Sequence, residues 1–599
     1  MKRCISLLLL GLAGTAHALI NPNFTPVQLI RQATAIWTAE ISHPEGNEDI
    51  FVATALQNLK GEALQARADI HFGSDPMQRE DILREIKEGS NAAYFITGDF
   101  SGASMDGGDV EEQPWAMVKI GIQWHMISRD EEGVLHLRRD EIDLSTVWAG
   151  DVRNLVEVTT YILENPRATV PVASGARWGA EQQVAELEGT IHGIAAFTIA
   201  ENPLVIVYRE EGDVILSPAQ EFADISGYLG LQSASRHATW GRFTDSPAVS
   251  MASAGADGTL QLWHREGEEF VLAKTWGPVA DITGLATVAR PGRAALLVGT
   301  AAGMQVHLTA EDTPAEVLPA APEALGAAGR VLALDLNGDG HADFVQSHAQ
   351  GIHLIRGADR SAHTFSHPQI GTPMSVAAAD FTGDGRLDLL ISGDRHAVFM
   401  VQEPEGTFTE RLRTTGELSY NIRPGVNFIA VGDHALDGRQ DLVLFNHQLP
   451  PQIYFNRGFA VFGYDMELDL QEDAFDTLDA LGSGQQAGLL ADLNGDGLQE
   501  LLAISREGAV WHVTRDTEGV QVLGARLFPP AGVSGPIPLV IRDGQDIIGA
   551  RIASPEAPAH IGRRNRGPVT VEFRLPGESE SRTERVIILR AQQQTLAGE

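Results

Sequence analysis

Four short acidic segments have the residue types and the spacing of loops that bind a metal ion. They begin at Asp335, Asp380, Asp433 and Asp492. Each carries an oxygen-bearing side chain at its first, fifth and ninth positions, and three of the four also carry one at the third. Calcium takes about six to eight oxygen ligands, and alternate residues of a tight loop can direct theirs at one centre. The pattern therefore predicts calcium binding.

The seventh position of such a loop would offer only its backbone carbonyl, so its side chain is free to vary. A glycine at the sixth position lets the chain turn sharply, because it has no Cβ to clash. The candidate metal ligands are Asp335, Asn337, Asp339, His341 and Asp343; Asp380, Thr382, Asp384, Arg386 and Asp388; Asp433, Asp437 and Asp441; and Asp492, Asn494, Asp496, Leu498 and Glu500. The Asp433 loop is the weakest, since Ala435 replaces its third ligand. It is either empty or completed by water.

A single segment of this kind can also be an ordinary turn held by Asp and Asn side chains. Three near-complete copies in one context favour a metal site. Apolar residues flank the copies, as at 331–334 and 344–345 around the first loop. A helix–loop–helix calcium site would need flanking helices and a Glu at the twelfth position. We therefore expect hairpins in which two strands flank a calcium loop.

The four segments recur at intervals of 45, 53 and 59 residues. Periods of about 40 to 50 residues with several short strands are typical of β-propeller blades. Weaker copies without the acids lie upstream, at 194–216, 240–263 and 285–308. Together they predict about seven blades over residues 190–528. A closed ring of blades removes the sheet edges that would otherwise aggregate.

With these loops, each followed by an apolar strand and a glycine-containing turn, the chain resembles the FG-GAP and VCBS repeat proteins. Their propellers are similar to that of the integrin α-subunit head. The resemblance implies that calcium binds the loops at the rim of the blades and braces them. It also implies that catalysis is not the usual role of the loops.

The segments on either side of the ring are predicted to form smaller structures. Residues 19–170 read as a separate small domain of the α+β or β-barrel type, with an OB-like barrel as one option. Its expected helices lie at 25–30 and 152–163, and its expected strands at 36–41, 51–59, 92–98 and 115–127. The tail, 529–599, has expected strands at 569–575 and 585–589. It forms either a small β-rich module or a strand that returns to close the ring.

The first 18 residues have the order of a secretory signal peptide. Lys2 and Arg3 precede an apolar stretch, 5–12, which is followed by the small-residue site at 16–18. The stretch is too short to span a bilayer, which needs about 20 residues. We therefore expect an exported protein, periplasmic or extracellular, without membrane insertion. Cys4 is the only cysteine, so the mature chain would have no disulfide and would depend on its core, strand closure or metal.

The formal net charge is −36, with 80 acidic and 44 basic residues. Such a surface repels nucleic acids and anionic membranes, so neither is an expected partner. It suits divalent cations.

Two functions of different classes remain open. One is a non-catalytic binding protein whose ligand, a protein or a glycan, is unknown. The other is a propeller enzyme acting on an extracellular polymer such as a polysaccharide, with its site in the central channel. The sequence has no Gly-x-Ser-x-Gly, His-Glu-x-x-His or phosphate-loop motif. A channel lined by titratable side chains and an aromatic would favour the enzyme, whereas apolar packing there would favour the binding protein.

Overall fold

The computed structural model shows two compact units, one holding the N-terminal barrel and the other the propeller with the tail. It describes residues 30–44, 46–73, 76–87, 92–98, 115–121, 123–139, 152–164, 177–199, 202–309, 311–416, 418–419, 422–456, 458, 460–467, 484–516, 523–563, 566–589 and 591–597. The expected signal peptide, 1–18, and residues 25–29 of the first expected helix lie outside these ranges.

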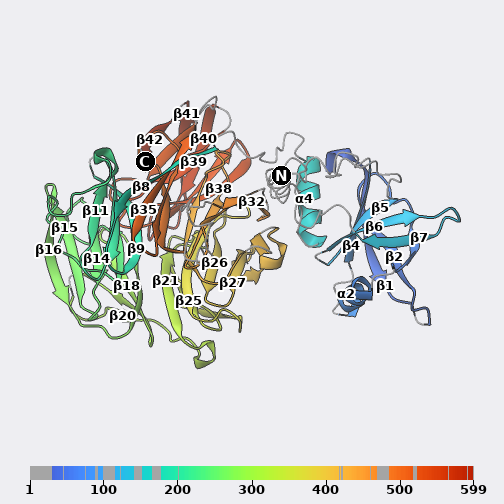
Figure 1. Ribbon diagram of the computed structural model, residues 1–599, viewed down its shortest axis with the longest axis horizontal. Coiled ribbons are helices and arrows are strands. Elements are labelled where there is room, and N and C mark those ends of the chain that lie inside the picture. Colours follow the sequence, from blue (N-terminus) through green and yellow to red (C-terminus); the bar gives the residue numbers. More distant parts are fainter. Residues whose placement is uncertain are drawn as a thin grey trace, which may run out of the picture. The chain divides into compact units, whose positions relative to one another are not determined.

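The N-terminal unit is a closed barrel in the strand order β1-β2-β3-β7-β6-β5-β4, with β1 hydrogen-bonded to both β2 and β4 (Figure 1). The strands are β1 (Ala33–Ser42), β2 (Ile50–Lys60), β3 (Arg67–His71), β4 (Ala92–Gly98), β5 (Ala116–Ile120), β6 (Gln123–Arg129) and β7 (Leu135–Arg139). Helix α2 (Pro76–Lys87) lies between β3 and β4 in the sequence, and α4 (Val152–Glu164) follows β7. Alternating buried residues of the strands, such as Trp37, Phe95 and Val118, fill the barrel.

The expected small barrel is confirmed, but two details differ. Residues 115–127 form two strands instead of one, because Gly121, at φ 56°, turns the chain between β5 and β6. The described strands number seven, whereas an OB-fold has five. The additional strands come from a meander, β4 to β7, whose last strand closes the barrel by pairing in parallel with β3.

Among the described residues, seven four-stranded antiparallel sheets of the second unit are the blades of a propeller, and the tail holds an eighth sheet of this kind. The first three are β9 (Ile191–Ile199) to β12 (Ala223–Asp224), β13 (His237–Gly241) to β16 (Glu269–Trp276), and β17 (Ile282–Val288) to β20 (Glu316–Val317). The next three are β21 (Ala328–Leu334) to β24 (Ala362–Ser366), β25 (Pro373–Ala379) to β28 (Phe408–Glu410), and β29 (Val426–Gly432) to β32 (Phe462–Glu467). The seventh contains β33 (Gln485–Ala491), β34 (Glu500–Ser505), β35 (Ala509–Asp516) and β8 (Arg177–Glu186).

Apolar packing between successive blades builds the ring. Blades four and five share a cluster that includes Val345 and Leu354 on one side and Ile391 and Met400 on the other. Blade one packs against blade seven in the same way, through Val205 and its neighbours. Both faces of each sheet are therefore buried, which explains why the second strands of the blades are continuous apolar runs.

The ring is closed by a strand from its own N-terminal end. β8 pairs with β35, so the last blade takes its outermost strand from residues that precede the first blade. The predicted number of blades is confirmed. The expected limits, 190–528, differ from the structure by one strand at each end, because β8 begins at Arg177 and β36 (Gly524–Phe528) pairs within the tail.

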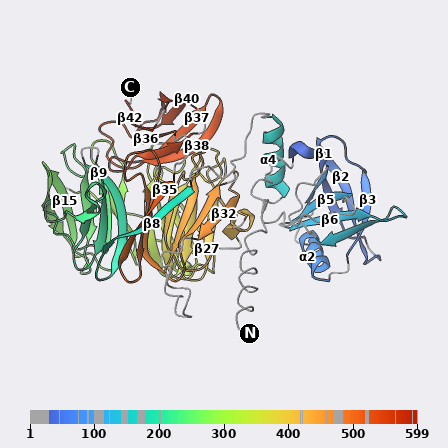
Figure 2. The same ribbon diagram turned by 45° about the horizontal axis from the view of Figure 1, so that its top comes forward.

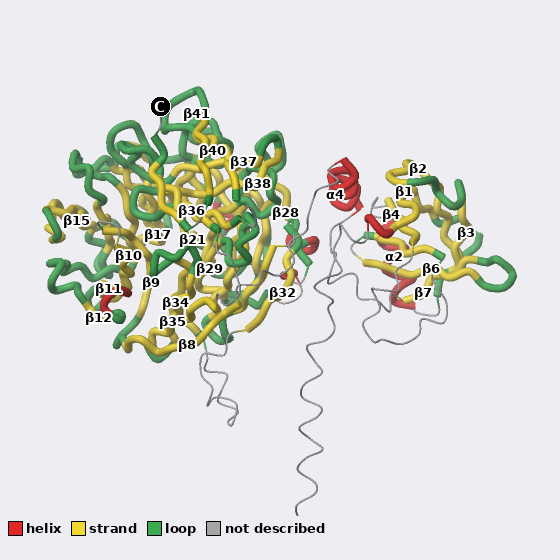
Figure 3. The backbone as a smooth tube through the Cα atoms, turned by 90° about the horizontal axis from the view of Figure 1, so that it is seen from above, coloured by secondary structure: helices red, strands yellow, loops and turns green. Residues whose placement is uncertain are grey.

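The tail is a separate β-module of two sheets, in the orders β39-β36-β42 and β38-β37-β40-β41. Its further strands are β37 (Ile537–Asp543), β38 (Asp546–Ala553), β39 (Ala559–Gly562), β40 (Gly567–Phe573), β41 (Arg582–Ile588) and β42 (Gln592–Thr595). The two sheets enclose a common core that includes Leu527, Leu539 and Val571. Figure 2 shows this module, coloured red, stacked over one end of the ring, and Figure 3 shows how strongly strands (yellow) predominate.

Candidate functional site

The four acidic loops occupy the same place in four successive blades. Each connects the innermost strand of a blade to its second strand: β21 to β22 (Asp343–His348), β25 to β26 (Asp388–Gly393), β29 to β30 (Asp441–Asn446) and β33 to β34. The ninth residue of each loop is the first residue of that second strand and is buried. The loops therefore lie at one end of the ring, which is the end covered by the tail.

Glycine permits the tight backbone of the loops at two positions. In the Asp380 loop the fourth and sixth residues, Gly383 and Gly385, have φ values of 79° and 87°. The Asp433 loop has Leu436 at the fourth position, with φ 54°. A non-glycine residue in the left-handed region is costly. This loop thus departs from the pattern in its backbone as well as in its third ligand.

The first aspartate of each loop organises the turn by accepting backbone N–H groups. Asp335 accepts hydrogen bonds from the backbone N of Asp339 at 3.0 Å and of Gly340 at 2.8 Å. Asp380, Asp433 and Asp492 accept the corresponding bond from the sixth residue at 2.7, 2.9 and 3.0 Å. The fifth residue in turn accepts the N–H of the seventh in every loop.

The ninth residue ties the loop to the sheet. Both oxygens of Asp388 accept backbone N–H groups: Oδ2 from Phe381 at 3.0 Å, and Oδ1 from Gln402, on the third strand of the blade, at 2.9 Å. Asp343 and Asp441 are held in the same way. In the fourth loop Glu500 replaces this aspartate, and Asn494 Nδ2 lies 3.0 Å from both Glu500 Oε1 and Asp496 Oδ2. The two acidic side chains therefore converge on one point.

Burial and the repulsion between neighbouring carboxylates disfavour the charged form of several acids in the loops. Burial raises the pKa of Asp380 to about 6, and the Asp384 carboxylate adds to this rise. Burial and then the Asp380 charge raise the pKa of Asp388 well above its ordinary value. The pKa of Asp335 rises to about 6 through burial and then the charges of Asp339 and Asp343, opposed by backbone N–H donors. A cation would relieve this repulsion.

Arginines supply positive charge to three of the loops from their edges. Arg356 Nη1 donates to Asp343 Oδ2 at 2.8 Å, and Arg386 pairs with Asp384. Arg526, from β36 of the tail, lies with Nε 3.4 Å from Asp492 Oδ2. Each of these contacts reaches one carboxylate of its loop.

The Asp433 loop differs because a buried guanidinium neighbours it. Arg551, from β38, donates from Nη2 to the carbonyl of Gly438, the sixth residue of the loop. Burial lowers the pKa of Arg551, and the carboxylates of Asp433, Asp380 and Asp437 raise it again. The guanidinium charge therefore acts on these three aspartates. His434 Nδ1 also lies 3.1 Å from Asp441 Oδ2. A guanidinium and an imidazole thus stand close to this loop.

The tail module is attached to the loops through these same aspartates. The backbone N of Ala550 donates to Asp380 Oδ2 at 2.7 Å, and the backbone N of Gly562 donates to Asp433 Oδ2 at 2.6 Å. His560 Nε2 donates to the carbonyl of Gly497 in the fourth loop at 2.6 Å. The first aspartate therefore shapes the loop and also receives the tail.

Three of the loops carry oxygen side chains at their first, third, fifth and ninth positions, the donor type that a hard cation would take. In two of them burial and neighbouring carboxylates raise the pKa of Asp335, Asp380 and Asp388. Among the described residues, no group of three or more His, Cys, Asp and Glu side chains stands as a ready metal cluster. The side chains of the seventh residues go elsewhere: His341 is exposed, whereas Leu498 is buried. At these positions only the carbonyl would bind.

Sequence reasoning found the acidic residues but not their partners. The loops came from local spacing, whereas Ala550, Arg551, His560 and Gly562 lie in the tail, far along the chain, and no pattern links them to the loops. Three loops have a glycine at the fourth position, directly before the acidic fifth residue. This glycine is a signal in the sequence for a backbone position with positive φ.

No described helix is long and apolar enough to span a membrane.

Comparisons with known proteins bear on the repeat. The model of the FG-GAP-like repeat matches residues 335–391, which contain the first two acidic loops. No curated protein sequence matches the chain. Among solved structures, BBS1N in complex with ARL6DN, soaked with lead, is 10% identical, with a TM-score of 0.40, and the match covers 57% of this chain and 97% of that one. The RRP9 WD40 repeats are 12% identical, with a TM-score of 0.35, and 58% and 99% are covered.

At these identities and TM-scores neither solved structure bears on function. The repeat match falls on two adjacent blades of a seven-bladed ring, and the other acidic loops stand at the same place in theirs. This chain therefore contains an FG-GAP repeat β-propeller.

Proposed function

We propose that this chain is an exported, non-catalytic binding protein whose propeller takes up calcium in three of its four acidic loops. The observation that carries the proposal is the position of the loops at the junction of blades and tail, where Asp380 shapes its own turn and accepts the Ala550 N–H. Calcium there would hold the blade ends and the tail in one arrangement. The signal-like residues 1–18 support export.

The loops beginning at Asp335, Asp380 and Asp492 would hold the ions. The Asp433 loop would remain without one, because Ala435 brings no ligand at the third position and Arg551 already donates to the Gly438 carbonyl of this loop. Binding at a free calcium level about ten times the dissociation constant stabilises a protein by roughly 1.4 kcal/mol for each site. Three sites would add about 4 kcal/mol, a sizeable part of a typical 5–15 kcal/mol.

The test is calcium titration of the purified mature chain, followed by thermal melts in calcium and in chelator. We expect three ions per chain. Asp339→Asn should remove one ion and lower the melting temperature by about 2 °C in calcium, following the loss of about 1.4 kcal/mol. Its melt in chelator should stay nearly unchanged, because an asparagine oxygen can still accept the His341 N–H.

The matched control is Asp437→Asn, at the fifth position of the Asp433 loop. It should leave the number of bound ions at three and shift both melts equally. The proposal would be contradicted if Asp339→Asn lowered the melting temperature equally in calcium and in chelator. It would also be contradicted if the natural chain bound no calcium.

The enzyme alternative has one observation in its favour. The central channel is not filled by apolar packing, since His192, His237 and His447 reach a cavity there together with Phe428. Polymer hydrolysis by a carboxylate pair would need two acids at that place. No Asp or Glu lines this cavity within the described part of the chain. The assay is release of reducing ends from neutral and acidic polysaccharides, and turnover by the natural chain would establish the alternative.

A further inference from the structure

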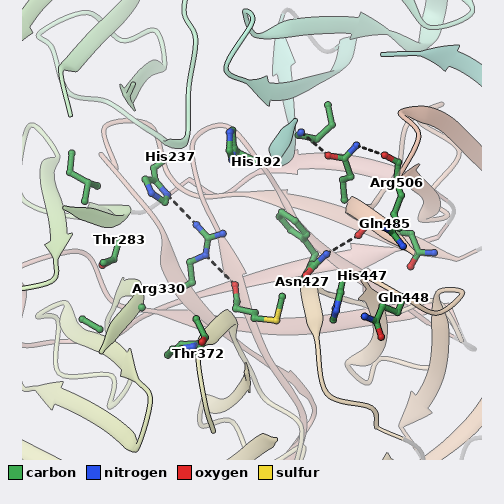
Figure 4. A pocket seen from close by; sticks show the side chains of 18 residues that line it. His192, His237, Thr283, Arg330, Thr372, Asn427, His447, Gln448, Gln485 and Arg506 are labelled. Atoms are coloured by element: carbon green, nitrogen blue, oxygen red, sulfur yellow. Dashed lines mark hydrogen bonds between the residues drawn. The ribbon is translucent and has the colours of Figure 1, made fainter. Parts of the chain in front are cut away.

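The open end of the propeller channel contains a cavity of about 700 Å³ on the axis of the ring. All seven blades supply it through their innermost strands, from Ile191 in the first to Gln486 in the last (Figure 4). On β21 the cavity is reached at Gly329 and Arg330, whereas the acidic loop begins after the other end of that strand, at Asp335. About five residues of strand, roughly 17 Å, separate the cavity from the loops.

The charge of the cavity is opposite to that of the protein. Arg330, Arg506 and three histidines are among the lining residues, and no described lining residue is acidic. The whole chain has 80 acidic residues and a net charge of −36. A mouth without carboxylates in such a protein concentrates positive potential at the axis of the ring.

Arg330 is fixed in the cavity from two sides (Figure 4). Its Nε donates to the carbonyl of Met374 at 3.1 Å, and its Nη1 donates to His237 Nδ1 at 3.1 Å. His237 can accept this bond only as a neutral imidazole. Burial, and then the Arg330 charge, lower the pKa of His237 to about 3, so it stays neutral at ordinary pH. The Nη2 group of Arg330 makes none of the hydrogen bonds present among the described residues.

Two carboxylates near the channel, Glu210 and Asp394, are engaged elsewhere. Glu210 lies 3.3 Å from His192 Nε2 and pairs with Arg236 at 2.5 Å. Asp394 accepts the Thr372 N–H at 2.7 Å. Glu556, from the tail, lines a second cavity that continues from the first past Arg330 towards the covered end. No ion pair joins Arg330 to any carboxylate in the described ranges.

We propose that this cavity binds a small organic anion, carrying a carboxylate or a phosphate, with Arg330 as its principal contact. A half-buried guanidinium without a counter-charge is costly, and an oxyanion at its Nη2 side would satisfy it. The fixed side chain is already oriented, so little conformational entropy is lost on binding. The volume suits a ligand the size of a sugar acid or a nucleotide. Arg506, exposed at the mouth, adds attraction at longer range.

The first experiment is calorimetric titration of the natural chain, in saturating calcium, with sodium glucuronate, inorganic phosphate and glucose. Glucuronate or phosphate should bind saturably and more weakly as sodium chloride is raised, whereas glucose, the neutral counterpart of glucuronate, should bind at least tenfold more weakly. Tighter glucuronate identifies the ligand as a carboxylate, and tighter phosphate identifies it as a phosphate. Absence of saturable binding by both anions would overturn the proposal.

The second experiment uses Arg330→Gln, with Arg293→Gln as the control. Arg293 forms an exposed ion pair with Asp245 and takes no part in the cavity. We expect at least a tenfold loss of anion affinity for the first variant and none for the second. If Arg330→Gln does not fold, Arg506→Gln decides, with an expected loss of about threefold. Unchanged affinity in the deciding variant refutes the assignment.

The inference goes beyond the proposed calcium role, and the two can fail separately. Calcium stoichiometry is measured on the same Arg330→Gln protein. Three ions with no anion binding in the natural chain would refute only the cavity assignment. Anion binding without calcium binding would refute only the proposed function.

Discussion

Single buried charges decide what the covered end of the propeller can do. Arg551 donates from Nη1 to the carbonyl of Ala550 at 2.9 Å and from Nε to that of His560 at 3.2 Å, so its guanidinium is fixed between the tail and two acidic loops. One side chain from the tail thus donates to the Asp433 loop and also acts electrostatically on Asp380 of the loop before it.

Glu556 gives a prediction for pH at this scale. Burial raises its pKa to about 7, and Oε2 accepts no hydrogen bond from the described residues. Because the pKa of Glu556 is raised in the folded state, the contribution of this group to the free energy of unfolding is greatest below about pH 4.5. That contribution is lost as the pH rises through about 7. Glu556→Gln removes this loss, so the variant should match the natural chain at pH 4.5 and exceed it at pH 8 by at most about 3 kcal/mol.

Urea unfolding of both proteins at the two pH values measures the difference. An equal change at pH 4.5 and pH 8 would show that the effect is not the titration of Glu556. Calcium is kept saturating throughout, so that the loops do not contribute to the comparison.

One strand decides whether the blades form a ring. β8 is the outermost strand of the seventh blade, and its Gln182 pairs with His512 of β35. This pairing joins the two ends of the propeller sequence. Without it no strand pairing would join the two ends of the ring, and the apolar cluster that includes Val205 and Leu502 would alone hold the seventh blade against the first.

Adjacent proline substitutions test this closure. In an edge strand, successive N–H groups point alternately to the neighbouring strand and to solvent, and proline is tolerated only where the N–H faces solvent. Of Glu181→Pro and Gln182→Pro, one should cost about 3 kcal/mol and lower the melting temperature by about 3–4 °C, and the other should change it little. The closure would be wrong if both variants melted like the natural chain.

Across the whole molecule, the loops and the tail form one coupled junction. Asp380 and Ala550 are 170 residues apart, and Asp433 and Gly562 are 129 apart, yet each pair is joined by a short hydrogen bond. Ser534 of the tail also donates to the carbonyl of Arg290, in the third blade, at 2.7 Å. Calcium in the loops would therefore set the stability of the tail's attachment.

The rate of amide hydrogen exchange measures this coupling between the loops and the tail at two comparable sites. The Ala550 amide donates to a loop expected to bind calcium, and the Gly562 amide donates to the loop neighbouring Arg551. We expect chelation to speed exchange in the peptide containing Ala550 at least tenfold and to change that containing Gly562 little. Equal acceleration of both would mean that the tail detaches as a whole, and no acceleration of either would remove calcium from the junction.

The local features of this protein can be predicted from its amino-acid sequence. The acidic loops, their apolar flanking strands and their recurrence are patterns within about 60 residues, and the backbone N–H bonds inside each loop follow from the same residues. The number of blades follows too, because each blade buries its faces against the next.

Only the tertiary structure decided the long-range pairings. The closure of the ring by β8, the tail over the acidic loops, and the Arg330–His237 pair in the channel join residues 334, 170 and 93 positions apart. No periodicity records such contacts, because each arises from the closed path of the chain around one axis. A ring brings the starts of all seven inner strands to one mouth and places the four acidic loops at the opposite end.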